Sequence, residues 1–316
     1  MKLIIQIPCF NEEKSLPETL RALPRKIAGI DEIEILIIDD GSTDGTVGAA
    51  RECGVNHIVK FTANRGLASA FMAGLDACLK LGADVIVNTD ADNQYCADDI
   101  AKLVAPILAG EADMVIGVRP IEEIKHFSFF KKRLQRFGSF AVNYFAGTKV
   151  EDTTSGFRAF SKEAAAKINI VSNYTYTLES IIQSYAKQIV IKTVNIRTNE
   201  MMRESRLITS LSKYISLSIS TILRTYAMYR PLKYFSILSA LMLIPGFTLG
   251  IRFLYYYSIG EGSGYIQSLI LCAVFLITGV IMFVIALVSD LIGINRKLIE
   301  DVLLRVKNIE IKIGKE

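Results

Sequence analysis

The clearest indication of the fold class lies in residues 83–94, which read ADVIVNTDADNQ. The apolar first half predicts a strand that is buried on both faces, as strands of parallel sheets are. Asp90 and Asp92 then fall at the carboxyl end of this strand, the edge at which open α/β sheets bind ligands. Together with Gln94 they offer hard oxygen ligands that suit Mg²⁺ or Mn²⁺. The stretch therefore predicts a metal-nucleotide site, because an ion held by so few protein oxygens usually shares its shell with phosphates.

Strands and helices alternate on both sides of this stretch. We expect strands at residues 3–8, 33–38, 57–61, 85–89 and 114–118, and helices at residues 15–27, 43–53, 66–81 and 98–108. The first helix is expected to begin with a capping box formed by Ser15 and Glu18. This alternation predicts an α/β fold with a mainly parallel, doubly wound sheet. Farther along, residues 153–160 predict a loop that enters a strand, residues 176–187 a helix and residues 189–196 another strand.

Composition and motif content disfavour several classes of protein. No G-x-G-x-x-G follows the first strand, which argues against a nicotinamide or flavin dinucleotide. The chain has only two histidines, so neither a zinc site built on histidines nor a Ser-His-Asp triad is expected. The formal net charge of +4 does not suggest nucleic acid as a partner. Five cysteines without C-x-x-C spacing predict reduced thiols.

The last part of the chain predicts two membrane spans. Charged residues nearly vanish after about Arg230 and return at Asp290, and residues 234–251 and 266–289 carry none. A helix of about 20 residues crosses the hydrocarbon core of a bilayer. A buried helical hairpin of a soluble domain is the alternative, but the second run is too long and too free of charge for it. Residues 207–230 read as one amphipathic, basic helix or a pair of them, suited to lie on a membrane surface.

The basic residues around the spans predict their orientation. They lie before the first span and after the second, as Arg224, Arg230, Lys233, Arg296 and Lys297, and the turn between the spans carries none beyond Arg252. The positive-inside rule then places both termini and the α/β part in the cytoplasm. The expected domains are residues 1–205 for the α/β part, 206–232 for the amphipathic helices, 233–292 for a transmembrane hairpin and 293–316 for a cytosolic helix. The hairpin would also allow a homo-oligomer.

Three polar clusters are expected to meet at one edge of the sheet. The first strand ends in PCFNEE at residues 8–13, the second in DDGSTDG at residues 39–45, and the fourth in TDADNQ at residues 89–94. A carboxylate after the second strand can accept a hydrogen bond from a ribose hydroxyl or a base N–H. Each cluster alone could be an ordinary turn or helix cap. Three of them in this order indicate a ligand site, since the carboxyl ends of parallel strands share one edge.

In these clusters the chain resembles family 2 glycosyltransferases, whose fold is the GT-A fold. The match consists of residues 8–13 (PCFNEE), 39–46 (DDGSTDGT), 64–66 (NRG) and 89–92 (TDAD). Residues 152–158 (DTTSGFR) and 203–206 (RESR) resemble more closely the dolichyl- or polyprenyl-phosphate sugar synthases. The resemblance covers about residues 1–210 by motif, and the hairpin is similar to that of members with membrane spans. Processive members carry Gln-x-x-Arg-Trp, and this chain has no Trp, so polymer synthesis is disfavoured.

The resemblance implies a role for each matching residue. The nucleotide sugar would be bound by Pro8, Asn11, Glu12, Asp39, Asp40, Asn64, Gly66 and Asp90. The metal, Mg²⁺ or Mn²⁺, would be held by Asp90, Asp92 and Gln94. The lipid phosphate would be met by Arg119, Arg133, Arg158, Arg203, Ser205 and Arg206, with Arg136 as an alternative to Arg133. Catalytic roles would fall to Asp92, Asp152 and Arg158.

The same resemblance implies a membrane-anchored enzyme that moves one sugar from a UDP- or GDP-linked donor to polyprenyl phosphate, such as undecaprenyl or dolichyl phosphate, with inversion. A phosphate monoester has a second pKa near 6, so it is already a nucleophile and needs arginines for docking rather than a base. A lipid hydroxyl such as that of diacylglycerol is the alternative acceptor, and it would need a base. Asp152 is the candidate base, although a role in orienting Arg158 or the sugar is favoured. A non-catalytic membrane scaffold is a third reading.

Overall fold

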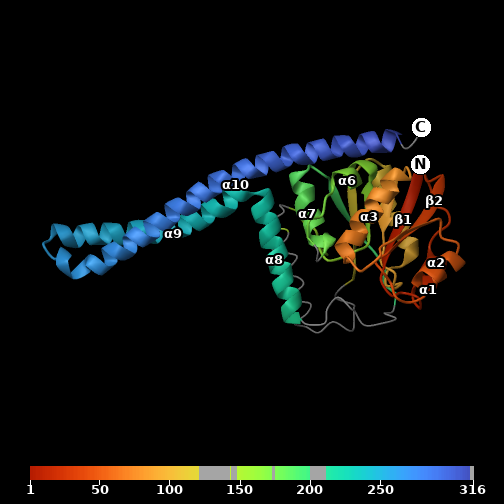
Figure 1. The fold of residues 1–316 in the computed structure, drawn as a ribbon, viewed down its shortest axis with the longest axis horizontal. Helices are drawn as coiled ribbons and strands as arrows, with labels where there is room; N and C mark the ends of the chain where they lie inside the picture. Colours follow the sequence, from red (N-terminus) through yellow and green to blue (C-terminus); the bar gives the residue numbers. More distant parts are fainter. Residues whose placement is uncertain (121–142, 144–147, 173–174, 200–210, 314–316) are drawn as a thin grey trace. The chain divides into compact units, whose positions relative to one another are not determined.

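The computed structural model describes residues 1–120, 143, 148–172, 175–199 and 211–313 of the 316-residue chain. These residues form two compact units (Figure 1). The first unit comprises Met1–Ile222 with Leu303–Glu316, and the second comprises Leu223–Val302. We call them the α/β unit and the helical unit. The four-part division expected from the sequence stays a prediction.

The α/β unit is built on one seven-stranded sheet (Figure 1). Its strands are β1 (Lys2–Cys9), β2 (Glu32–Asp39), β3 (His57–Lys60), β4 (Val85–Asn88), β5 (Met114–Val118), β6 (Arg158–Ser161) and β7 (Ile191–Asn195). The order across the sheet is β3-β2-β1-β4-β6-β5-β7. Only β6 runs antiparallel to its neighbours, β4 and β5. The predicted α/β fold with a mainly parallel sheet is therefore confirmed.

Helices cover both faces of this sheet. They are α1 (Leu16–Ala22), α2 (Thr46–Glu52), α3 (Leu67–Lys80), α4 (Ile100–Leu108), α6 (Lys162–Lys167) and α7 (Tyr176–Ala186), with a 3₁₀ turn, η1, at Ala97–Asp99. One apolar cluster joins one face of the sheet to α3, α6 and α7, and a second joins the other face to α1, α2 and α4. Along β1 the side chains alternate between the clusters, Ile4 in the first and Ile5 in the second. Such a strand is buried on both faces, as its unbroken apolar sequence predicts.

The start of α1 corrects one expectation. Ser15 makes no capping bond, and its hydroxyl donates instead to Glu12 Oε2 at 2.6 Å. Its backbone is already helical, and Pro17 stands at the second helical position without an N–H to be capped. The predicted capping box of Ser15 and Glu18 is therefore wrong. The helix also ends at Ala22, five residues before the predicted end, because Pro24 follows it closely.

Two helices are long and apolar enough to cross a membrane, α9 (Pro231–Ser258) and α10 (Ile266–Ile313). The first lies in the helical unit, and the second belongs to it as far as Val302. They are linked by a 3₁₀ turn, η2 (Gly262–Tyr265), and preceded by α8 (Leu211–Tyr229). The sequence left open whether one amphipathic helix or two precede the spans. The described residues form one helix there, α8. The tail was expected as a separate helix, but it continues α10 to Ile313 without a break. A glycine inside a helix costs about 1 kcal/mol relative to alanine, which is too little for Gly293 to end α10.

Small residues bring α9 and α10 together. A Cβ added to Gly246 would lie 2.9 Å from Leu276 Cδ2, and one added to Gly279 would lie 2.6 Å from Leu243 Cδ2. The hydroxyl of Ser239 also donates to the carbonyl of Gly279 at 2.8 Å. Close backbone approach at small residues is how helices associate in membranes. These contacts lie within one chain, and the expected homo-oligomer stays a prediction.

Candidate active site

The loops that follow β1 and β2 interlock at the carboxyl edge of the sheet. The N–H of Asn11 donates to Ser42 Oγ at 2.9 Å, and Asn11 Oδ1 accepts from the N–H of Thr43 at 2.8 Å. The N–H of Glu12 donates to Thr46 Oγ1 at 2.8 Å. Two of the three predicted clusters therefore converge as the sequence suggests. Asn11 and Glu12 help to hold the β2 loop, which is a structural task that the motif alone did not reveal.

The two carboxylates at the end of β2 have different surroundings. Asp40 accepts hydrogen bonds from the N–H groups of Arg65 at 2.7 Å and Gly66 at 2.9 Å, one on each oxygen. Asp39 is fully buried, and its Oδ1 accepts from the N–H of Ser42 at 3.0 Å. Its Oδ2 has no hydrogen-bond partner among the described residues. A buried carboxylate oxygen left unpaired is costly. Asp39 is therefore the member of the pair that is open to a ligand N–H or hydroxyl.

Asp90 and Asp92 follow β4 on the same edge. Burial and the charge of Asp92 raise the pKa of Asp90 to about 7. Asp92 Oδ1 accepts from the N–H of Gln94 at 3.1 Å. The described residues contain no group of three or more His, Cys, Asp or Glu side chains that could hold a metal ion. Two mutually repelling carboxylates nevertheless fit a divalent cation, and the ligand set of Asp90, Asp92 and Gln94 stays a prediction.

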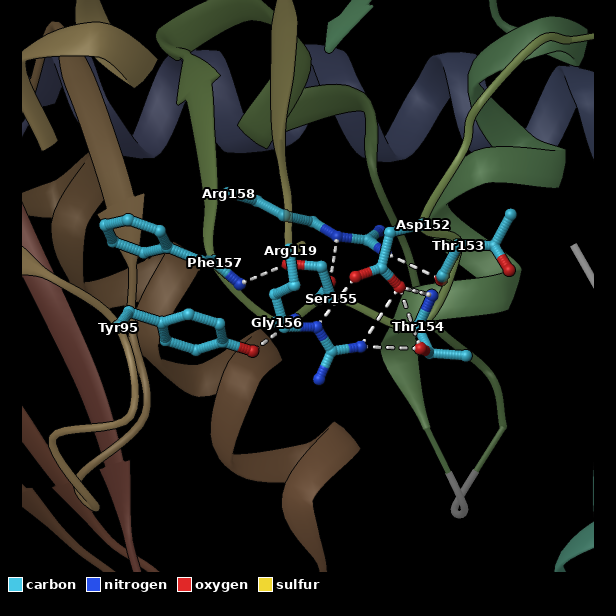
Figure 2. Close-up of polar contacts among 9 residues, drawn as sticks. All are labelled: Tyr95, Arg119, Asp152, Thr153, Thr154, Ser155, Gly156, Phe157 and Arg158. Carbon is cyan, nitrogen blue, oxygen red and sulfur yellow. Dashed lines mark hydrogen bonds and ion pairs between the residues drawn. The ribbon is translucent and has the colours of Figure 1, made fainter. Parts of the chain in front are cut away.

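Arg119 and Asp152 form an ion pair (Figure 2), and the positive charge of Arg119 lowers the pKa of Asp90. Arg119 Nε donates to Asp152 Oδ2 at 2.7 Å, and Arg119 Nη2 donates to Asp152 Oδ1 at 3.0 Å and to Thr154 Oγ1 at 2.8 Å. Burial alone would raise the pKa of Asp152, but the charge and hydrogen bonds of Arg119, with those of Thr154, lower it below its usual value. Asp152 is therefore an ionised partner that fixes Arg119. This geometry disfavours the base that the sequence left open, and the arginine that Asp152 orients is Arg119.

Arg158 lies in the interior of the α/β unit. Its side chain is fully buried, and its guanidinium donates to the carbonyls of Thr153, Ser155 and Thr177 and to the hydroxyl of Ser180, at 2.6–3.0 Å. Burial lowers the pKa of this guanidinium to about 10. Each of its three guanidinium nitrogens donates to the protein interior, and in this way Arg158 braces residues 153–155 against α7. These contacts disfavour the expectation that Arg158 meets the lipid phosphate or acts in catalysis, and that expectation stays a prediction.

Four further residues of the expected phosphate site lie outside the described residues. They are Arg133, Arg203, Ser205 and Arg206, and Arg136 lies outside as well. Their roles stay predictions. Of the other expected residues, Pro8 lies in β1, and Asn64 and Gly66 lie in the loop held by Asp40.

Sequence reasoning missed a buried polar group beneath the site. Gln6 Nε2 donates to Asn88 Oδ1 at 2.9 Å, and Asn88 Nδ2 donates to the Tyr176 hydroxyl at 2.8 Å and to the carbonyl of Gly156 at 2.9 Å. Tyr95 reaches the same glycine from the other side, because the N–H of Gly156 donates to its hydroxyl at 3.1 Å. A signal was present, since Gln6 and Asn88 are the polar residues in the buried stretches 3–9 and 85–88, and they are register partners.

Comparison with known proteins agrees with this geometry. Residues 4–168 match the family model for glycosyl transferase family 2. The polyprenol monophosphomannose synthase of Mycolicibacterium smegmatis is 30% identical over 54% of this chain and 65% of that protein. The UDP-N-acetylglucosamine–dolichyl-phosphate N-acetylglucosaminyltransferase of Methanococcus voltae is 30% identical over 61% of this chain and 83% of that protein.

The fold is also similar to that of a solved enzyme. Glucosyl-3-phosphoglycerate synthase of Mycobacterium tuberculosis, crystallised with Mn²⁺, UDP-glucose and phosphoglyceric acid, superposes with a TM-score of 0.57. The match has 20% sequence identity and covers 72% of this chain and 80% of that one, which supports the GT-A fold alone. With the family model spanning more than half of its length, this chain belongs to glycosyl transferase family 2.

Proposed function

We propose that this chain transfers a single sugar from a nucleoside diphosphate sugar to polyprenyl phosphate. By their names, the relatives above act on polyprenol or dolichyl phosphate and differ in the sugar. The observation that carries the proposal is the Arg119–Asp152 ion pair. In this pair the Arg119 guanidinium is a fixed cation, which a phosphate acceptor needs for docking. The Asp152 carboxylate, which a hydroxyl acceptor would need as its base, is already bound to Arg119.

The donor would bind across the ends of β1, β2 and β4. The unpaired Oδ2 of Asp39 suits an N–H of the base or a hydroxyl of the ribose. Asp90 and Asp92, with Gln94, would hold Mg²⁺ or Mn²⁺ against the diphosphate. When bound, the ion stabilises the charge that develops on the leaving nucleoside diphosphate.

The acceptor would dock on Arg119. Two of the guanidinium nitrogens, Nε and Nη2, hold Asp152 and Thr154, and Nη1 makes no bond to any residue drawn in Figure 2. In the proposal, Nη1 donates to an oxygen of the acceptor phosphate. A phosphate oxygen that attacks the anomeric carbon in line with the leaving diphosphate inverts the configuration there. No proton needs to be removed, because the acceptor is mostly dianionic at neutral pH.

The two apolar helices would anchor the enzyme in a membrane with the α/β unit on the cytoplasmic side. A cysteine at Glu261, in the link between the spans, should react with an impermeant thiol reagent on intact cells. A cysteine at Lys297, after the second span, should react only after lysis. The reverse pattern would refute the orientation.

The test of the function is a panel of radiolabelled UDP- and GDP-sugars offered with three acceptors. Polyprenyl phosphate should be labelled by one of these donors. The matched polyprenol, which has the same chain without the phosphate, should not be labelled, nor should diacylglycerol. Labelling of either hydroxyl lipid in preference to the phosphate would refute the proposal.

A further inference from the structure

Beyond the second apolar run, α10 continues as a charged helix that carries one apolar stripe. Residues 290–313 contain nine charged residues, whereas residues 266–289 contain none. The stripe consists of seven exposed residues, one polar and six apolar: Ile292, Asn295, Ile299, Val302, Val306, Ile309 and Ile313. We call this set the α10 stripe. An apolar face on a helix in water normally packs against another element.

The α10 stripe is regular as well as exposed. Its members lie alternately three and four residues apart, and none of the nine charged residues falls on it. The six apolar members are 45–67% exposed. A mean spacing of 3.5 residues is that of the a and d positions of a heptad, along which helices wind around one another. The spacing therefore predicts that the partner of the stripe is another helix.

The opposite face of α10 already has its own partner. Leu304 and Ile311 pack into the apolar cluster that contains residues of α3. They lie seven residues apart and take the f position when the α10 stripe takes a and d. The f position is on the far side of the helix from the a and d seam. Packing against α3 therefore leaves the stripe uncovered.

The residues beside the α10 stripe suit a second copy of the same helix. In a parallel coiled coil, the g residue of one helix meets the e residue five positions later in the other helix. Those pairs would be Leu298 with Leu303 and Arg305 with Glu310, apolar with apolar and cation with anion. Glu310 Oε2 lies 3.9 Å from Lys80 Nζ of its own chain, and its side chain is still 55% exposed. The charges next to the seam thus favour self-association in the parallel direction.

We propose that the α10 stripe is an interface between copies of this chain, in which the α10 helices form a parallel coiled coil beyond the second span. The parallel direction rests on the membrane anchoring in the proposed function, because copies inserted by the same span point the same way. The interface itself needs no sugar transfer. A single polar residue in an apolar seam, here Asn295, favours the register in which it meets its own counterpart.

The first test compares Ile299→Glu with Ile294→Glu in the full chain. Both isoleucines are exposed on α10, but Ile299 lies on the stripe and Ile294 at a c position away from it. Light scattering in detergent gives the mass of the protein part. We expect the original chain and Ile294→Glu to be oligomers of equal mass. We expect Ile299→Glu to be a monomer at the same concentration, because its carboxylate would be buried in the seam without a partner.

A second pair of variants repeats this comparison farther along the helix. Ile309→Glu places the charge on the stripe, and Asn308→Glu places it on the neighbouring exposed position. Only Ile309→Glu should lose the oligomer. Both positions are exposed in the single chain, so Tm should change little in either variant.

The direction of the helices is tested with cysteines at Ile299 and at Ile309, one at a time. Membranes that contain each variant are oxidised with copper phenanthroline. Both Ile299→Cys and Ile309→Cys should form a disulfide between copies, since each stripe residue faces its own counterpart in a parallel pair. An antiparallel pair cannot bring both positions together. Ile294→Cys, which keeps the same five native cysteines, is the control that should form none.

Several results would overturn the inference. One is an original chain that is monomeric, and another is an equal mass for Ile299→Glu and Ile294→Glu. A third is cross-linking of Ile294→Cys as readily as Ile299→Cys, as expected if the stripe lies against lipid. Cross-linking at only one of positions 299 and 309 would exclude the parallel coiled coil. An oligomeric original chain that transfers no sugar to polyprenyl phosphate would remove the proposed function and leave this interface standing.

Discussion

The donor side of the site, at the ends of β2 and β4, differs from the segment at residues 152–158 in how its charges are satisfied. On the proposed donor side, one oxygen of Asp39 has no hydrogen-bond partner in the described part of the chain, and Asp90 is held beside the like charge of Asp92. In residues 152–158 the charged groups are paired within the protein, Asp152 by Arg119 and Arg158 by carbonyls and Ser180. The difference favours a ligand-binding role for the ends of β2 and β4. It favours a structural role for residues 152–158, which hold Arg119 in place.

The largest effect should follow the loss of Asp92, a proposed metal ligand on the proposed donor side. Asp92→Ala should lower kcat/KM by at least about a hundredfold, because removal of an outer partner alone costs about 10- to 100-fold in metal affinity or activity. A chelator should have the same effect on the original chain. Tm should change little, since Asp92 is partly exposed at a strand end. Full activity of the variant or in the presence of chelator would exclude the metal assignment.

The segment at residues 152–158 should lose stability instead. Arg158→Met would leave the carbonyls of Thr153, Ser155 and Thr177 without their donor. Each buried group left unsatisfied costs about 1–3 kcal/mol, so unfolding should need several kcal/mol less free energy. Chemical denaturation in detergent measures it. A variant of unchanged stability that has lost only its affinity for the acceptor would restore the phosphate-binding role of Arg158.

A change at Arg119 should lower the activity toward the acceptor and leave donor binding unaffected. Arg119→Lys keeps the charge but loses the planar fork that holds Asp152 while it offers Nη1. A charge-assisted contact is worth about 1.5–3 kcal/mol, so kcat/KM for polyprenyl phosphate should fall about ten- to a hundredfold. The donor KM should remain within about twofold. A rise in donor KM with no change for the acceptor would reverse the assignment of the two sides.

The smallest effect should come from the unpaired oxygen of Asp39. Asp39→Asn would keep an oxygen for the N–H of Ser42 and place an NH₂ where the donor needs an acceptor. The donor KM should then rise about tenfold, as for the loss of one hydrogen bond to a charged group. Tm should not fall, because the buried oxygen that is replaced has no partner among the described residues. A fall in Tm with an unchanged donor KM would show that Asp39 is part of the scaffold.

The sequence predicted the sheet, because its buried strands are unbroken apolar runs. It also predicted that the polar loops meet, because the carboxyl ends of parallel strands lie on one edge of the sheet. It could not tell Asp39 from Asp40, since adjacent residues alternate in direction and both suit a motif. It could not show that Arg119 and Arg158 have different roles, because an arginine in a motif can bind a ligand or donate to several backbone carbonyls. Tyr95 and Gly156 were missed as a pair because their contact joins segments 61 residues apart.

The antiparallel direction of β6 explains how residues 152–157 reach the edge of the sheet that carries the candidate active site. Parallel strands deliver to that edge the residues that follow them, whereas β6 delivers the residues that precede it. Its register pairs Arg158 with Asn88 and Ala159 with Val87. A slip of one residue would turn every side chain of β6 to the opposite face. It would also replace Gly156 by a residue with a side chain, although a Cβ at that place would lie 3.2 Å from both carboxylate oxygens of Asp90. An insertion or deletion of one residue between Gly156 and Arg158 should therefore damage both the metal site and the core, although it would alter no residue that binds substrate.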